Sequence, residues 1–221
     1  MNNALNIEKK TMILVAVFSA ALILGNILGS KVTTIFGITT SVGIFAYPIT
    51  FLITDIIEEV RGKEITKTFI YAGIVSLILA FVLVLIGIKM NPASFYKNND
   101  AYTLVFSNSM RVICASLVAF TLGQIHDIWS FNFWKKRTAG KFLWLRNNLS
   151  TIISQLIDTT IFTFIAFYLV TPEFTIARII SMIVPYWLLK VIFAVVDTPF
   201  VYLGVKWLKG KSLKTISNSE D

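Results

Sequence analysis

Long apolar runs separated by short polar connections restrict the folds that this chain can adopt. A helix needs roughly 20 consecutive apolar residues to cross the hydrocarbon core of a bilayer. The runs of about that length cover residues 12–29, 42–60, 67–89, 104–126, 149–171 and 179–205. With 56% hydrophobic and 14% charged residues, the chain is also too apolar for an ordinary soluble domain. We therefore predict an all-α integral membrane protein with six transmembrane helices.

The basic residues predict the orientation of these helices because they cluster on alternate connections. The richer side holds Lys9, Lys10, Arg61, Lys63, Lys67, Lys135, Lys136, Arg137, Lys141, Arg146, Lys206, Lys209, Lys211 and Lys214. The opposite side holds Lys31, Lys89, Lys97 and Arg178. Cytoplasmic connections of membrane proteins carry the excess of lysine and arginine, so we expect both the N-terminus and the C-terminus to be cytoplasmic. The net charge of +8 then reflects topology, and no nucleic-acid partner is expected.

The expected organisation is one membrane domain with short cytoplasmic ends. Residues 1–11 would form the N-terminus, residues 12–207 the six-helix transmembrane domain and residues 208–221 the tail. A single cysteine, Cys114, and a single histidine, His126, exclude a disulfide framework and argue against a metal centre. The sequence has no G-x-S-x-G, H-E-x-x-H or P-loop motif. We therefore expect no catalytic residues, no metal and no cofactor.

Ionisable residues inside the predicted spans point to a functional site. The charged ones are Asp55, Asp158, Asp197, Arg111 and Lys190. A charge at the centre of a transmembrane helix costs about 2.5–3.5 kcal/mol on insertion scales. Side chains that carry such a cost are expected to face one another, a ligand or a hydrated cavity. The alternative is that they only pair with each other and hold the helices together.

Helical spacing groups these charges with polar neighbours. Asp55 lies three residues before Glu58, so the two side chains share one face of their predicted helix. Gln155 and Asp158 are also one turn apart, on another predicted helix. Asn26 lies near the end of the first apolar run and could reach the same site. The spacing therefore predicts one polar site to which several helices contribute.

Three separate stretches indicate a family. They read "PITFLITDIIEEVRGK" from Pro48, "QIHDIWSFNFWKKRT" from Gln124 and "LWLRNNLSTIISQLIDTTIFTFIAF" from Leu143. Together and in this order they resemble the queuosine precursor transporters of the vitamin uptake transporter family. The resemblance extends from about Asn26 to Phe167. It implies a multi-pass protein of the plasma membrane that imports 7-deazaguanines, such as 7-cyano-7-deazaguanine, for salvage into modified tRNA.

The resemblance also implies a substrate-binding role for the polar residues. A guanine-like edge carries adjacent N–H donors, which an ionised carboxylate can accept in bidentate fashion, while an amide can meet the neighbouring carbonyl. On this interpretation Asp55 or Glu58, together with Asp158, accepts the N–H groups of the base. Gln155 and Asn26 make supporting polar contacts. The expected partners are thus a small deazapurine and the lipid bilayer.

The remaining charged residues, Arg111, Lys190 and Asp197, would balance charge or hold gates. Lys190 and Asp197 lie about 10 Å apart along one helix axis, too far for a direct ion pair, so each needs a partner elsewhere. The aromatic ring that stacks on the base stays open between Tyr47, Phe51 and Tyr186.

A second class of function also fits the chain. Six helices and a small size suit a substrate-binding subunit that moves its ligand only within an ATP-energised vitamin uptake complex. Ala16 and Ala20 form a small-xxx-small step in the first run that could dock another helix. A homo-oligomer or an energising module therefore stays a possible partner.

Overall fold

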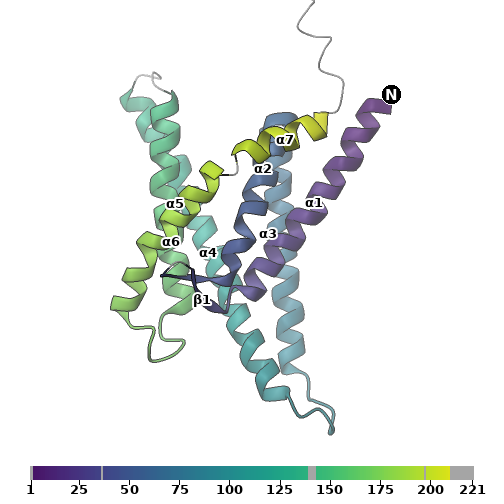
Figure 1. The fold of residues 1–221 in the computed structure, drawn as a ribbon, viewed down its shortest axis with the longest axis vertical. Helices are drawn as coiled ribbons and strands as arrows, with labels where there is room; N and C mark the ends of the chain where they lie inside the picture. The colour runs from purple at the N-terminus through teal and green to yellow at the C-terminus, as the bar shows by residue number, and fades with distance from the viewer. Residues whose placement is uncertain (1, 36, 139–142, 197, 210–221) are drawn as a thin grey trace, which may run out of the picture. The chain divides into compact units, whose positions relative to one another are not determined.

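The computed structural model describes residues 2–35, 37–138, 143–196 and 198–209, and most of them are helical. In chain order the elements are α1 (Asn2–Leu28), β1 (Val32–Ile35), β2 (Ile38–Ser41), the 3-10 helix η1 (Val42–Phe45), α2 (Tyr47–Arg61), α3 (Lys63–Lys89), α4 (Asn99–Arg137), α5 (Leu143–Phe167), α6 (Ile176–Val196) and α7 (Thr198–Lys209). Figure 1 traces them from α1 in purple to α7 in yellow.

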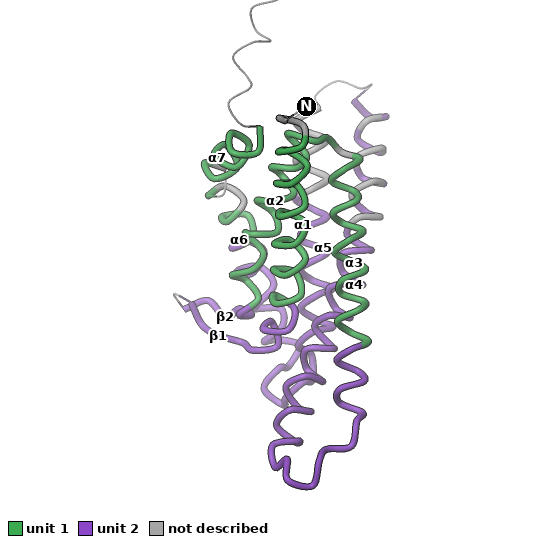
Figure 2. The backbone as a smooth tube through the Cα atoms, turned by 90° about the vertical axis from the view of Figure 1, so that its right-hand side faces the viewer, with its two compact units in different colours: residues 1–25, 43–82, 190–221 green, residues 26–42, 83–189 purple. Residues whose placement is uncertain are grey.

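The chain forms two compact units, which Figure 2 shows in green and purple. Unit 1 comprises residues 1–25, 43–82 and 190–221, and unit 2 comprises residues 26–42 and 83–189. The boundaries fall inside α1, η1, α3 and α6. Each unit therefore brings together segments that are distant in the sequence.

Unit 1 is built around the isoleucine face of α2. Its buried core comprises Phe18, Ile53, Ile56, Ile57, Phe69 and Leu208. The three isoleucines lie on one side of α2 because their spacing follows the helical period. Gly204 lets α7 lie directly on α2, since a Cβ at this position would be 2.1 Å from the Cδ1 atom of Ile56. The packing of unit 1 therefore fixes which face of α2 is left for polar residues.

Unit 2 contains a β-hairpin that the sequence analysis did not foresee. β1 and β2 pair antiparallel, with Val32 opposite Ser41 and Ile35 opposite Ile38. Both strands are rich in valine, isoleucine and threonine, whose branched Cβ favours extended backbone. Gly37 in the connecting turn has a φ of +80°, which glycine adopts without steric cost. The fold is therefore mainly, but not purely, α-helical.

Several helices are suited to a membrane, which agrees with the prediction of a multi-pass membrane protein. Within the described residues, four helical segments are long and apolar enough to cross a bilayer. They are Leu5–Leu28, Glu64–Lys89, Asn99–Gly123 and Ile176–Phe193, and Ile152–Phe167 is a shorter apolar helix. The count of six crossings and the cytoplasmic position of the termini stay predictions.

The second expected span, residues 42–60, is not one continuous helix. It begins with η1, and α2 then runs for 15 residues, about 22 Å at the helical rise of 1.5 Å per residue. Pro48 lies in the first turn of α2, where the missing N–H of proline is tolerated. Gly62 ends the helix with a φ of +79°, and its N–H donates to the Glu58 carbonyl. The expected start of this span is therefore wrong for a continuous α-helix, whereas the expected end at Val60 lies one residue before Arg61.

The structure describes the last expected span, residues 179–205, as two helices, and residue 197 between them lies outside the described residues. α6 ends at Val196 and α7 begins at Thr198. Pro199 favours a helix start here, because proline cannot donate a backbone hydrogen bond but fits the first turn of a helix. The connection expected between the fourth and fifth runs is largely helical instead, since α4 continues to Arg137 and α5 begins at Leu143.

Candidate functional site

In unit 1, the acidic face of α2 lies opposite its isoleucine core. Asp55 and Glu58 are both exposed, whereas Ile56 and Ile57 between them are buried. The alternation follows from the helical period, which turns Asp55 and Glu58 to the side opposite the hydrophobic core. The local sequence therefore presents carboxylates from a helix that is firmly anchored by its other face.

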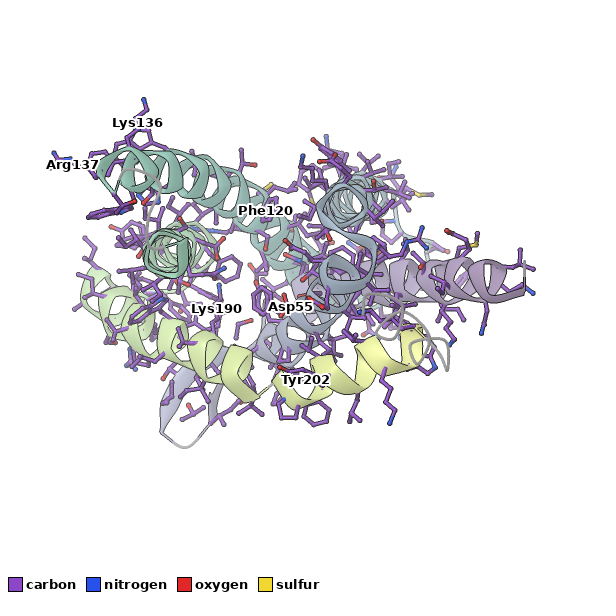
Figure 3. All side chains as sticks on the ribbon, turned by 90° about the horizontal axis from the view of Figure 1, so that it is seen from above. Asp55, Phe120, Lys136, Arg137, Lys190 and Tyr202 are labelled. Atoms are coloured by element: carbon purple, nitrogen blue, oxygen red, sulfur yellow. The ribbon has the colours of Figure 1, made fainter. Side chains whose placement is uncertain are left out.

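Lys190 lies beside the start of this acidic helix. Its side chain is 5% exposed, and its Nζ lies 5.1 Å from the centroid of the Tyr47 ring, within the range of a cation–π contact. Tyr47 stacks on Phe51, with ring centroids 6.2 Å apart. Tyr47, Phe51 and Asp55 follow one another at four-residue spacing, so they form one row along α2. Figure 3 labels Asp55 on α2 and Lys190 on α6.

In unit 2, a row of small residues on α4 brings α5 close. Ala115 and Ala119 are fully buried, and Gly123 continues the row at the same four-residue spacing. A Cβ built on Gly123 would lie 3.4 Å from the Asp158 Cβ and 3.6 Å from the Ser154 carbonyl oxygen. Small side chains allow such close helix contact. The row of small residues therefore determines how closely Asp158 lies to α4.

The neighbouring turn of this helix pair is polar. The Nδ1 atom of His126 lies 3.0 Å from the Oγ atom of Ser154. Ser154 is buried, and Gln155 and Asp158 are half-buried on the same helix. His126 also contacts the Trp129 ring, with centroids 5.8 Å apart. An amide, a carboxylate, a hydroxyl and an imidazole are thus gathered where α4 meets α5.

Asn26 is held in place by α4. Its side chain is 4% exposed, and the Ser116 hydroxyl donates to its Oδ1 over 2.5 Å. Two turns earlier on α4, the Ser109 hydroxyl donates to the Ile27 carbonyl over 2.9 Å. These two contacts fix the end of α1 within unit 2 and orient the Asn26 amide.

Arg111 makes contacts typical of a helix cap. Its Nε donates to the Ile165 carbonyl over 2.6 Å, and its Nη2 donates to the Tyr168 carbonyl. Ile165 lies in the last turn of α5 and Tyr168 directly follows this helix, where backbone acceptors lack helical partners and a positive charge is favourable. The cation thus has a structural use of its own, while its role in charge balance or gating stays a prediction.

The structure brings the predicted residues into two sets. Unit 1 holds Asp55, Glu58 and Lys190, and unit 2 holds Asn26, Gln155, Asp158 and Arg111. Asp197 lies outside the described residues. Among the described residues there is no group of three or more His, Cys, Asp or Glu that could hold a metal ion.

The residues that position these groups were missed by the sequence analysis. Ser116 and Ser109 gave no signal of their own, because serine is common in membrane helices and its partner cannot be known without the helix register. Gly123 could have been found from the four-residue spacing of Ala115, Ala119 and Gly123, which is a small-residue stripe.

Comparison with known proteins gives consistent matches. The model of the vitamin uptake transporter family matches residues 41–204. A Bacillus subtilis protein named as a probable queuosine precursor transporter is 29% identical over 190 residues, which cover 85% of this chain and 81% of that protein. The queuosine precursor transporter of Escherichia coli is 29% identical over 135 residues, covering 61% of this chain and 58% of its own length. No solved structure gives a significant match.

Proposed function

We propose a function from one premise: the chain belongs to the vitamin uptake transporter family, whose members are transporters and not enzymes. The expectation that the chain is not an enzyme is thereby confirmed. Its proposed substrates are queuosine precursors, 7-deazaguanines such as 7-cyano-7-deazaguanine, imported across the plasma membrane for tRNA modification. The observation that carries this proposal is the match over 85% of the chain to a relative with that name.

The residues of unit 1, taken by themselves, suit the hydrogen-bonding edge and the ring face of such a substrate. A 7-deazaguanine presents a ring N–H beside an exocyclic amino group, and a carboxylate can accept both hydrogens. Asp55 and Glu58 stand on the exposed face of α2, and Phe51 and Tyr47 offer aromatic rings about one and two turns away from Asp55, respectively. A carboxylate beside an aromatic ring can bind the edge of a flat heterocycle and stack on its face.

The residues of unit 2, taken by themselves, also suit polar groups of such a base. Asp158 is an acceptor for N–H donors, and Gln155 on the preceding turn carries both an acceptor and a donor. Asn26 is pre-oriented by Ser116, which lowers the entropy lost when its amide binds a ligand. Lys190 and Arg111 are proposed to balance the charge of these acids, and Asp197 is proposed to act with them in gating or charge balance. Nothing in the family or in its named relatives supports the subunit of an ATP-energised complex, so that alternative is not proposed.

The test is rescue of queuosine in a cell that can neither make nor import its precursors. The full chain is expressed in this cell, 7-cyano-7-deazaguanine is supplied, and queuosine in tRNA is measured by mass spectrometry. The native chain is expected to restore the modified base. Asp55→Asn and Asp158→Asn each replace an acceptor by a group that also donates, which leaves a substrate N–H unpaired at a cost of about 1–3 kcal/mol.

Such a cost corresponds to roughly a 5- to 150-fold loss of uptake at low substrate concentration. Asp100→Asn is the matched control, because Asp100 is an exposed aspartate in the first turn of α4. The control is expected to keep full rescue. Normal rescue by both site variants would show that the assigned carboxylates do not bind the substrate, while no rescue by the native chain would refute the proposed substrate itself.

A further inference from the structure

α7 has two faces of different character within unit 1. Its inner face packs on α2 through Val201, Gly204 and Leu208, the last of which is fully buried. The opposite side carries Tyr202, which Figure 3 labels and which is 75% exposed, and Leu203, which is 65% exposed. A short helix with one anchored face and one exposed aromatic and aliphatic face is typical of helices that lie at a membrane surface.

Three lysines belong to the last turn of this helix or contact it. Lys206 and Lys209 occupy its last turn. Lys10, which comes from α1, donates from its Nζ to the Trp207 carbonyl over 2.5 Å and lies 4.9 Å from the centroid of the Trp207 ring. Figures 1 and 2 both show the N-terminal end of α1 and α7 at the same end of unit 1. One lysine would be enough to cap the helix, and among the described residues none of the three forms an ion pair.

We propose that Lys10, Lys206, Lys209 and Trp207 form a binding surface for the headgroup of an anionic phospholipid. The lysines supply the positive charge that a lipid phosphate requires, and each basic residue near an anionic membrane strengthens its attraction about fivefold. The partly exposed indole suits the headgroup level of a bilayer. Tyr202 and Leu203 continue the surface as apolar contacts, which suit acyl chains and not a small soluble anion.

The test compares lipid binding by two charge-matched variants of the full chain. Lys206→Gln with Lys209→Gln removes two of the proposed contacts. Lys89→Gln with Lys97→Gln removes the same charge from the end of α3 and the connection that follows it, and serves as the control. Binding of phosphatidylglycerol and of phosphatidylcholine to each purified protein is measured by native mass spectrometry, and thermal unfolding in phosphatidylcholine shows that each variant is folded.

The first variant is expected to bind phosphatidylglycerol at least fivefold more weakly than the native chain, whereas the control changes less than twofold. Lys206→Arg with Lys209→Arg keeps the charge and is expected to keep the affinity. Equal weakening by the control variant, or unchanged binding by the first variant, would overturn the proposal. A second contrary result would be displacement of the lipid by millimolar inorganic phosphate, because the surface would then select free anions. The proposal does not depend on the substrate that is transported.

Discussion

Replacement of Ser116 by alanine is expected to impair substrate binding through Asn26. The Ser116 hydroxyl donates to Asn26 Oδ1 over 2.5 Å, and the asparagine is 4% exposed. Without this bond the Asn26 amide has to be ordered when the ligand binds, which costs about 0.5–1.5 kcal/mol for one side chain. The Michaelis constant for the proposed deazapurine substrate should therefore rise roughly 2- to 12-fold.

Ser109→Ala provides a control on the same helix. Ser109 lies two turns before Ser116 and also binds the end of α1, but its hydroxyl donates to the Ile27 carbonyl and not to a side chain. The Ser109 hydroxyl is also within reach of the Val105 carbonyl of its own helix. Its loss removes a similar helix contact and leaves the Asn26 amide oriented. We expect Ser109→Ala to lower the midpoint of thermal unfolding as much as Ser116→Ala does, with an unchanged Michaelis constant.

The assay is initial uptake of 7-cyano-7-deazaguanine over a range of concentrations, with the transporter amount measured in the same membranes. The decisive comparison is the Michaelis constant at a matched amount of folded protein. If Ser109→Ala raises it as strongly as Ser116→Ala, the effect arises from helix packing and the positioning role of Ser116 is refuted. An unchanged value for Ser116→Ala leads to the same conclusion.

Three other substitutions separate packing from function. Gly204→Ala should lower the thermal unfolding midpoint by several degrees, since overpacking a core costs about 1–3 kcal/mol and the new Cβ would meet Ile56 at 2.1 Å. Gly123→Ala should lower that midpoint less, because its closest contact, Asp158 Cβ, is at 3.4 Å, but it should reduce uptake by displacing that aspartate. Arg111→Met should lower the midpoint by several degrees, because two carbonyls at the end of α5 lose hydrogen bonds worth about 1.5–3 kcal/mol each. Equal unfolding midpoints for the two glycine variants, or a native midpoint for Arg111→Met, would contradict these assignments.

The sequence predicts a helix correctly where a long apolar run is sufficient to determine the structure. The run over residues 67–89 is a single helix that ends at Lys89 as expected. Prediction failed where a local backbone preference competes with hydrophobicity. The strands β1 and β2 are set by branched residues around Gly37, and the division between α6 and α7 coincides with Pro199. Hydropathy averaged over a window of helical length does not register either feature.

The sequence predicts which chemical groups the candidate site would contain, but not which partners these groups have in space. Charged residues stand out in an apolar chain, so Asp55, Asp158 and Lys190 can be proposed as candidates without a structure. Their partners depend on the register between helices, which no single helix encodes. The contact of Lys190 with Tyr47 joins residues 143 positions apart, and the cap that Arg111 places on α5 also follows from tertiary packing.

The row of Arg111, Ala115, Ala119 and Gly123 shows how such a register arises from simple physical terms. Four-residue spacing keeps these side chains on one face of α4, and the three small ones let α5 approach until its backbone meets Gly123. Once the helices are in contact there, Arg111 has the correct offset to reach the carbonyls at the end of α5. A large residue at position 123 would separate the helices at the turn that carries Asp158. The position of the Asp158 carboxylate relative to α4 is therefore determined by small residues and not by charges. A search for charged residues alone identifies this acid but does not predict its position.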